Sequence, residues 1–340
     1  MIAMSADGER RQFGRSFTRR TLIAGLIVGA TAIGATLNAS LAVADDGIIA
    51  AGGSGRPEKT AITFGVALTA DHAPLYLGVN QGFFKQEGLD VTVRTTNPAN
   101  AVTSLLSGEL DVTSVTFVQI VTGAKQGVLV SVVAEVDRAS KGYTAYVVKA
   151  GSPTKTLADL ARKKIGVPQL NGICDFLLND DFRAAGIAYG SVQYVALPFA
   201  DLVPTVLSGG VESICLPEPL LTPTLEQGTI ISVHDLFSGQ HDNWPIGTYA
   251  VSPSFAKANP NTIGALQRAL AKSRALAREK PEMVRQVLPT YAPIKPELAN
   301  KIVLPEYPGT TDRSAVNRVV DLLKRVKFLS PDFTFPKSSG

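Results

Sequence analysis

Short runs rich in β-branched residues alternate along the chain with stretches whose apolar residues recur at helical spacing. This alternation is typical of a parallel sheet flanked by helices. In the first half of the chain it predicts strands at 61–68, 90–95, 111–116 and 129–136, and helices at 74–85, 98–107 and 117–126. Gly82, Gly88, Gly108 and Gly127 stand in or after the last turns of these helices, where glycine commonly ends a helix.

A second series of the same kind follows. Strands are predicted at 164–167, 193–197, 211–216 and 230–233, and helices at 173–185, 201–207 and 219–226. Two pieces of the first series recur at one offset of 101 residues: "FGV" at 64–66 returns as "IGV" at 165–167, and "LLSGELDVTSV" at 105–115 returns as "VLSGGVESICL" at 206–216. The shared offset predicts two similar α/β units.

Two further strands connect these units. The run "YTAYVVKA" at 143–150 joins the first unit to the second, and "GTYAVSPSFA" at 247–256 is the return strand, so we expect a hinge. An amphipathic helix follows at 259–284, with apolar Ile263, Leu266, Ala269 and Leu270 on one face. We therefore expect one lobe over 61–150 and 247–340, including the C-terminal helices, and a second lobe over 151–246.

The amino terminus has the pattern of an export signal. Five arginines precede an almost uncharged run from Leu22 to Ala44, which ends in the small-x-small sequence "AVA". The stretch "TRRTLI" at 18–23 is similar to the twin-arginine export motif. A transmembrane anchor is the alternative, but small residues dominate the second half of the run. We expect a signal peptide over 1–44, a flexible Gly-rich leader over 45–60 and a soluble, periplasmic mature chain.

Charge and motifs narrow the function. Five arginines and two acids lie within 1–44, so the remainder has 28 basic and 27 acidic side chains, a net charge of +1. A chain with so little net positive charge lacks the basic surface that nucleic-acid binding needs. The sequence contains no CxxC, HExxH, G-x-S-x-G or Walker pattern, which weighs against a metal site and against the common enzyme classes.

Four segments resemble, in order, parts of the periplasmic solute-binding proteins that serve ABC transporters for nitrate, sulfonates, taurine and thiamine precursors. They are "APLYLGVNQGFFKQEGLDVTV" at 73–93, "TLADLARKKIGV" at 156–167, "LSGGVESICLPEP" at 207–219 and "FAKANPNTIGALQRAL" at 255–270. The resemblance implies two Rossmann-like α/β lobes joined by two crossing strands, the type II periplasmic binding fold. It also implies a monomer without a cofactor that captures a small solute and presents it to a membrane permease with its cytoplasmic ATPase.

The alternative is an enzyme on the same fold, similar to the synthases of the thiamine pyrimidine or to chorismate dehydratases. The export signal favours the binding protein, because those enzymes work in the cytosol.

Ligands of open α/β sheets bind outside the carboxyl ends of the strands, where loops turn into helices. Two facing lobes would bring their polar elbows into one cleft. The candidate ligand-binding residues at these elbows and near the second crossing are Asp71, His72, Thr116, Phe117, Asn171, Gly172, Asp175, Glu218 and Trp244.

Several of these residues have simpler explanations. Asp71 is also an ordinary helix N-cap, and His72 could be merely exposed. Asp175 lies in a first helical turn, where an acid is favourable without any ligand. Trp244 could fill the hinge instead of lining the cleft.

Two further hypotheses concern charge and cysteines. The elbows carry three acids and no Lys or Arg, so we expect a neutral or cationic solute, such as a heteroaromatic amine stacked near Phe117 or Trp244, unless Arg138 or Lys141 reaches the cleft. Cys174 and Cys215 follow strands that are adjacent in the expected fold, so we expect them to be near neighbours, and a disulfide between them is possible.

Overall fold

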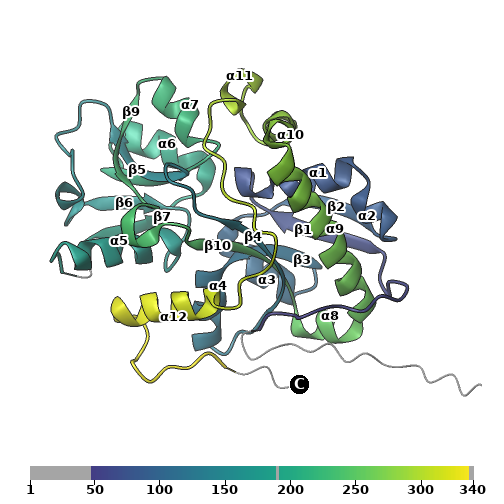
Figure 1. Cartoon of the computed structure of the whole chain (residues 1–340). Coiled ribbons are helices and arrows are strands. Elements are labelled where there is room, and N and C mark those ends of the chain that lie inside the picture. Colours follow the sequence, from purple (N-terminus) through teal and green to yellow (C-terminus); the bar gives the residue numbers. More distant parts are fainter. Residues whose placement is uncertain (1–46, 189–190, 337–340) are drawn as a thin grey trace, which may run out of the picture. The chain divides into compact units, whose positions relative to one another are not determined.

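The computed structural model describes residues 47–188 and 191–336 (Figure 1). The export signal expected over 1–44 lies outside these residues. Within them, no helix is both long enough and apolar enough to cross a membrane.

The first lobe is built on a five-stranded sheet with the order β2-β1-β3-β10-β4. Its strands are β1 (Ala61–Val66), β2 (Asp90–Thr95), β3 (Val112–Thr116), β4 (Ser131–Arg138) and β10 (Pro245–Val251). Strand β1 runs parallel to β2 and β3, whereas β10 lies antiparallel between β3 and β4. The helices of this region are α1 (Ala73–Asn80), α2 (Phe83–Gln86), α3 (Ala101–Leu106) and α4 (Phe117–Lys125).

The second lobe repeats this arrangement with the order β7-β6-β8-β5-β9. Its strands are β5 (Thr144–Lys149), β6 (Lys164–Val167), β7 (Gln193–Ala196), β8 (Ser213–Pro217) and β9 (Ile230–Asp235), and its helices are α5 (Ile173–Ala184), α6 (Phe199–Ser208) and α7 (Leu221–Glu226). In the first sheet Phe64 pairs with Val112, and in the second Ile165 pairs with Ser213. Both positions differ by the 101 residues seen in the sequence, so the predicted pair of similar units is confirmed.

Each of the two connecting strands lies in the sheet opposite to that of the strand before it in sequence. Strand β5, which we placed at the end of the first lobe, hydrogen-bonds between β8 and β9 in the second sheet, and β10 hydrogen-bonds in the first. The chain therefore crosses between the lobes at 139–143 and again at 236–244 (Figure 1). Both β5 and β10 pair with a neighbouring strand on each side. Their apolar residues show that they are buried strands but do not show which of the two sheets they join.

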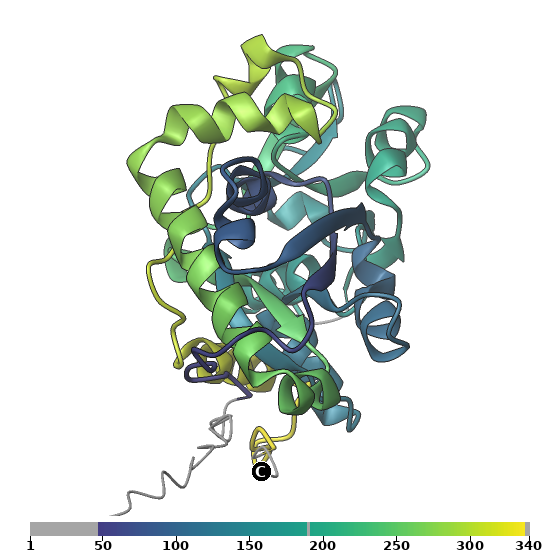
Figure 2. The same ribbon diagram turned by 90° about the vertical axis from the view of Figure 1, so that its right-hand side faces the viewer.

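The segment 47–60 is packed against the first lobe, whereas we expected a flexible leader. Ile48 and Ile49 are each 2% exposed, and the Ile49 N–H donates to the Val132 carbonyl at 2.9 Å. Gly52 lies against Gly264, so close that a Cβ on Gly52 would stand 2.1 Å from the Gly264 nitrogen. Figure 2 shows this segment passing beside the long helix α9 (Pro260–Glu279). Two buried isoleucines and a glycine contact hold it in place.

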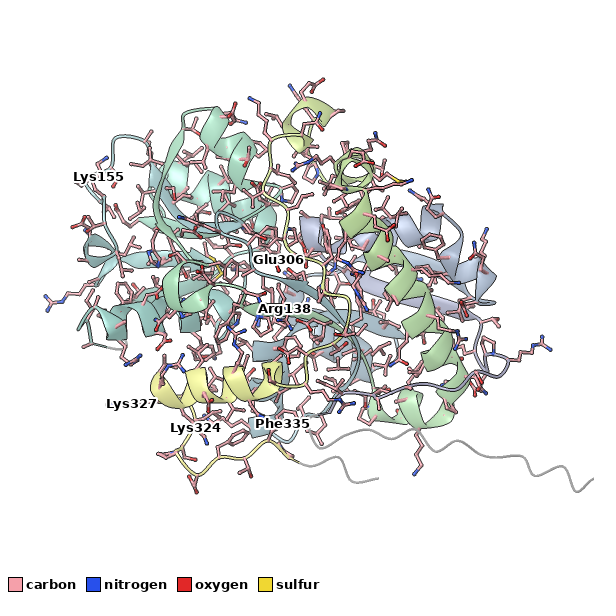
Figure 3. The ribbon with its side chains drawn as sticks, in the orientation of Figure 1. Arg138, Lys155, Glu306, Lys324, Lys327 and Phe335 are labelled. Carbon is pink, nitrogen blue, oxygen red and sulfur yellow. A yellow bond between two sulfur atoms is a disulfide. The ribbon has the colours of Figure 1, made fainter. Side chains whose placement is uncertain are left out.

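The C-terminal part contains α8 (Pro253–Ala258), α9, α10 (Pro281–Val287), α11 (Pro296–Ala299) and α12 (Ala315–Arg325). In α9 the predicted apolar face is confirmed, because Ile263, Leu266, Ala269 and Leu270 are buried against the first lobe. Beyond α11 the chain contacts both lobes, although we assigned it to the first. Arg138 and Glu306 exchange two backbone hydrogen bonds of 2.8 and 3.0 Å (Figure 3).

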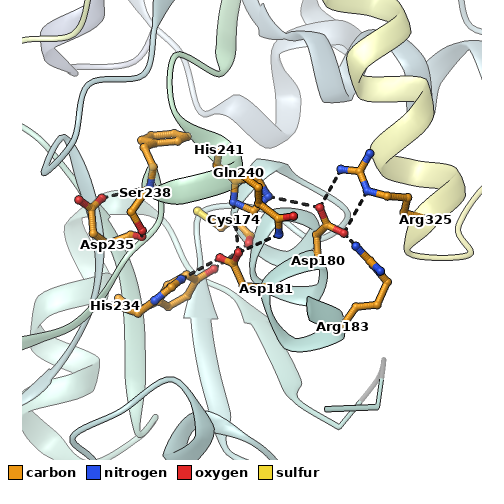
Figure 4. A network of polar contacts seen from close by, with 12 residues as sticks. Cys174, Asp180, Asp181, Arg183, His234, Asp235, Ser238, Gln240, His241 and Arg325 are labelled. Atoms are coloured by element: carbon orange, nitrogen blue, oxygen red, sulfur yellow. Dashed lines mark hydrogen bonds and ion pairs between the residues drawn. The ribbon is translucent and has the colours of Figure 1, made fainter. Parts of the chain in front are cut away.

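A polar network fixes α12 to the second lobe (Figure 4). Arg325 Nη2 of α12 lies 2.8 Å from Asp180 Oδ2 of α5, and Asp180 also pairs with Arg183. The His241 ring, in the second crossing segment, lies 3.4 Å from both Asp180 and Asp181. Three segments far apart in sequence thus meet around two neighbouring carboxylates.

Candidate functional site

A cavity of about 130 Å³ lies where the carboxyl ends of the strands of both lobes meet. The first lobe lines it from the loop after β1 and from the start of α4, and the second lobe from the loop after β6 and from β8. Engineered protein cavities of about 150 Å³ accept benzene, so this space suits a small organic molecule. Both crossing segments also reach the cavity, which places it at the hinge.

Asp71 and His72 line the cavity from the elbow after β1. The Tyr143 hydroxyl donates to Asp71 Oδ1 at 3.3 Å, and His72 Nε2 lies 3.3 Å from Asp71 Oδ2. The other ring nitrogen of His72 is 3.2 Å from the Tyr249 hydroxyl. Burial lowers the pKa of His72, although Asp71 opposes this shift. A neutral imidazole at neutral pH leaves the negative charge of Asp71 uncompensated by its neighbour.

Thr116 lines the cavity at the start of α4, whereas Phe117 is fully buried in the core. Thr116 Oγ1 accepts the Gln119 N–H at 3.1 Å, and Gln119 Oε1 accepts the Thr116 N–H at 2.8 Å. This reciprocal capping box fixes the elbow and places Gln119 at the cavity too. Gln119 was not among the predicted residues, although the spacing T-x-x-Q is a capping-box signal that indicates it.

At the elbow after β6, Gly172 and Cys174 line the cavity, but Asn171 and Asp175 do not. The Asp175 carboxylate accepts the N–H groups of Asn171 and Gly172 at 2.6 and 2.7 Å. Burial raises the pKa of Asp175 to about 7, against the opposing effect of these hydrogen bonds. Asp175 therefore caps its own helix, which is the simpler of the two explanations.

Glu218 and Trp244 also lie outside the cavity lining. Glu218 is fully buried and accepts hydrogen bonds from Thr222 and from the Val303 N–H, the latter at 3.2 Å. Burial raises its pKa. Trp244 packs edge-on to His241 and beneath Arg318, so it fills the crossing region instead of forming a cleft wall.

The aromatic residues that do line the cavity were not predicted from the sequence; they are Tyr143, Phe199 and Phe237. Tyr143 ends the first crossing segment and Phe237 lies in the second, and their rings stack with centroids 6.5 Å apart. The position of Tyr143 and Phe237 beside the crossings was the available signal, because the crossing segments pass between the lobes.

No lysine or arginine in the described part of the chain lines this cavity. Arg138, which could have reversed its charge, is held elsewhere, since its Nε lies 2.9 Å from Glu135 and its Nη2 lies 3.0 Å from Asp312. Asp71 is thus the charged side chain that a bound solute meets.

Cys174 and Cys215 form a disulfide with their Cα atoms 6.3 Å apart. The expectation that they are neighbours is therefore confirmed, and the bond ties the start of α5 to β8 at the cavity, where Cys174 is a lining residue.

Solved structures with this fold are known. The alkanesulfonate-binding protein SsuA from Xanthomonas axonopodis pv. citri, solved with MOPS bound, is 15% identical and has a TM-score of 0.69, covering 80% of this chain and 95% of that one. The nitrate-binding protein NrtA from Synechocystis PCC 6803 is 18% identical with a TM-score of 0.66, covering 82% of this chain and 84% of that one. At these identities the likeness establishes the periplasmic-binding-protein fold.

In sequence, the chain is 27% identical over 210 residues to YtlA of Bacillus subtilis (strain 168), whose name describes a binding protein. The match covers 60% of this chain and 61% of YtlA, so the chain spans less than two thirds of that relative. The family model described as "NMT1/THI5 like" matches residues 69–284, well over half of the chain, and the chain therefore belongs to the NMT1/THI5-like family.

Proposed function

We propose that this protein is the solute-binding component of an ABC importer and that it captures a neutral or cationic organic solute between its lobes. The observation that carries the proposal is the cavity itself, whose lining combines one carboxylate, three aromatic rings and polar elbows from both lobes. A ligand that contacts both lobes stabilises their closed arrangement, which a permease can recognise.

The charge of the lining favours a cation or a neutral hydrogen-bond donor. Asp71 stands in a desolvated setting beside a neutral His72, where an anion would meet unfavourable repulsion. The structurally similar proteins SsuA and NrtA are named for binding alkanesulfonate and nitrate, and both of these solutes are anions. Because the described lining here offers no basic side chain to such anions, we infer a different solute class.

The shape of the lining favours a flat, aromatic part in the solute. Tyr143 and Phe237 line the cavity at the hinge with stacked, largely buried rings, and Phe199 contributes from α6. A protonated amine would bind Asp71 while an attached heteroaromatic ring packs against these side chains. This assignment replaces Phe117 and Trp244, which do not line the cavity, as the aromatic partners.

Export and delivery complete the proposal. The twin-arginine pattern at 18–23 and the "AVA" sequence at 42–44 suit a chain that is cleaved and released on the outer side of the cytoplasmic membrane. There it would act as a monomer and pass its solute to a permease powered by a cytoplasmic ATPase.

The test is calorimetric titration of the mature protein with a pyrimidine amine, taurine, an alkanesulfonate and nitrate. We expect the amine to bind and the Asp71→Asn variant to lose about 10- to 100-fold in affinity, as for a lost charged hydrogen bond. The matched control is Asp242→Asn, which removes an exposed acid near the second crossing and should leave affinity unchanged. Tight binding of a sulfonate that survives Asp71→Asn would contradict the proposed solute class.

The same samples test the enzyme alternative. Stoichiometric recovery of unchanged solute after long incubation is expected for a binding protein. Sustained formation of product from a pyrimidine or chorismate-like substrate would instead identify an enzyme on this fold.

A further inference from the structure

A second cavity, of about 290 Å³, lies in the first lobe and shares no described lining residue with the cavity between the lobes. Four segments surround it: the leader at Ile48–Ala50, strand β4 at Val133 and Ala134, helix α9, and the loop before α12. It is therefore the place where the leader and the loop before α12 meet the sheet. Helix α9 contributes Gln267 and Arg274, and the loop contributes Thr310, Thr311 and Arg313.

Arg274 is the residue of this cavity that needs an explanation. It is 6% exposed, and its Nε donates to the Pro308 carbonyl at 3.0 Å. Its Nη1 is buried and has no hydrogen-bond partner among the described residues. A guanidinium keeps its charge in proteins, and a buried charge without a partner is costly. Burial lowers the pKa of Arg274, and the nearby Arg278 lowers it further.

The acids near Arg274 are engaged elsewhere. Glu135 is the carboxylate whose charge acts on Arg274, but Glu135 accepts hydrogen bonds from the Arg138 side chain and from the Asp312 N–H, the latter at 2.7 Å. No described Asp or Glu lines the cavity. Among the described lining residues, Arg274 is therefore the buried cation whose Nη1 is available to a ligand.

The neutral groups of the lining suit an acceptor ligand. Thr311 Oγ1 accepts the Glu135 N–H at 3.0 Å, which leaves the Thr311 hydroxyl proton free to donate. Gln267 is not available to a ligand, because its side-chain amide already forms hydrogen bonds with the backbone of Ile49, Gly52 and Val133. Guanidinium and hydroxyl donors around a polar space are the usual chemistry of an oxyanion site.

We propose that this cavity binds a small tetrahedral oxyanion, phosphate or sulfate, held by Arg274 and completed by the Thr311 hydroxyl. The volume exceeds that of cavities that hold benzene, so such an ion fits. The bound ion neutralises Arg274 and joins the leader and the C-terminal loop to the first lobe. It stabilises the fold by mass action and is independent of the solute cavity.

The experiment titrates the full mature protein with inorganic phosphate and, separately, with sulfate, using chloride at matched ionic strength as the control salt. Calorimetry should show one site for at least one of the oxyanions, and the melting temperature should rise with its concentration. Arg274→Met should weaken binding by about 10-fold or more, the loss expected for a charge-assisted contact.

Three variants make the result decisive. Lys272→Met removes a cation from the exposed side of α9, where it pairs with Glu87, and should change affinity less than about 2-fold. Asp71→Asn should leave oxyanion binding intact. If Arg274→Met does not fold, Thr311→Val, which removes the hydroxyl donor, should also weaken binding. Absence of binding at millimolar oxyanion, or equal affinity in Arg274→Met, Thr311→Val and Lys272→Met, would overturn the proposal and leave a cavity filled with water.

Discussion

Asp71, Asp175 and Glu218 show how the same functional group takes different roles at similar elbows. The carboxylates of Asp175 and Glu218 accept backbone N–H groups from their own surroundings, at Gly172 and Val303 among others. Asp71 instead contacts two side chains, the Tyr143 hydroxyl and the His72 ring, and lines the cavity. Since a carboxylate has a limited number of lone pairs, backbone donors decide which acid is left for a solute.

Gly264 offers a test at the residue scale. A Cβ at this position of α9 would stand 1.9 Å from the Gly53 carbonyl oxygen. Alanine has a helix propensity about 1 kcal/mol better than glycine, but this clash is with backbone and cannot be relieved by a rotamer change. We expect Gly264→Ala to lower the free energy of unfolding by about 1–2 kcal/mol in urea denaturation, since overpacking outweighs propensity.

Gly309→Ala is the matched control, because its Cβ would meet only the end of Arg278, at 3.8 Å or more. This substitution should be neutral or slightly stabilising. Equal stability of the two variants would mean that the leader does not dock on α9.

The conformation of each elbow between a strand and a helix depends on hydrogen bonds between residues close in sequence. The capping box of Thr116 and Gln119 begins α4 at the cavity, and the Asp175 carboxylate organises the start of α5. Strand β1 is followed by a 3-10 turn, Ala70–His72, before α1 begins at Ala73. The single helix predicted at 74–85 is divided into α1 and α2, because Gly82 adopts the left-handed conformation with φ of 71°.

The disulfide between α5 and β8 gives the second prediction. Cys174 and Cys215 close a loop with a sequence separation of 41 residues, and loop-closure entropy for such a loop corresponds to about 4 kcal/mol. The double variant Cys174→Ser/Cys215→Ser should lose up to about this amount of unfolding free energy while it keeps its secondary structure. Urea denaturation of both proteins measures the difference.

Reduction of the natural protein is the parallel experiment and should destabilise it to a similar extent. Two free thiols titrated in unreduced, unfolded protein would refute the bond.

At the scale of the whole described molecule, the two lobes have a third connection besides the two crossing segments. The C-terminal chain binds Glu218 through Val303, pairs with Arg138 through Glu306 and reaches α5 through Arg325. If the lobes close, the C-terminal chain that contacts both of them must therefore move together with the two crossing segments.

The network around Asp180 makes stability depend on pH. Burial alone would lower the pKa of His241, but Asp180 and Asp181 raise it to about 9. A folded-state pKa above the unfolded value of about 6.5 means that this stabilisation is fully present below about pH 6.5 and is lost as pH rises through about 9. We expect the natural protein to lose up to about 3 kcal/mol of this contribution between pH 6 and pH 9.5.

His241→Gln should lack this decline, so urea denaturation of both proteins at the two pH values isolates it. Parallel stability profiles would show that His241 does not titrate in this way. On the acid side the sign reverses: hydrogen bonds from His241 and the arginines lower the pKa of Asp180 despite burial, so its contribution is present above about pH 4 and lost below.

The local pattern of the sequence determined the elements, their order and the pairing of similar units. Strand and helix periodicity depends on residues close in the chain, so β1–β4, α4, α5 and the apolar face of α9 could be predicted within a few residues. The repeated 101-residue offset predicted that the second sheet resembles the first. The correspondence between the two sheets then indicated which elbows face each other, and Asp71, His72, Thr116 and Gly172 at these elbows do line the cavity.

Only the tertiary structure decided which sheet received β5, that the leader docks through Gly52, and that Asp71 alone among the three predicted acids reaches the cavity. These outcomes depend on backbone donors, ring faces and close contacts supplied by distant segments. Val303, Phe237 and Gly264 are such partners, and each is separated by dozens of residues from the group it meets. The periodicity of apolar residues along the sequence does not predict these contacts, because they form only when the chain has folded.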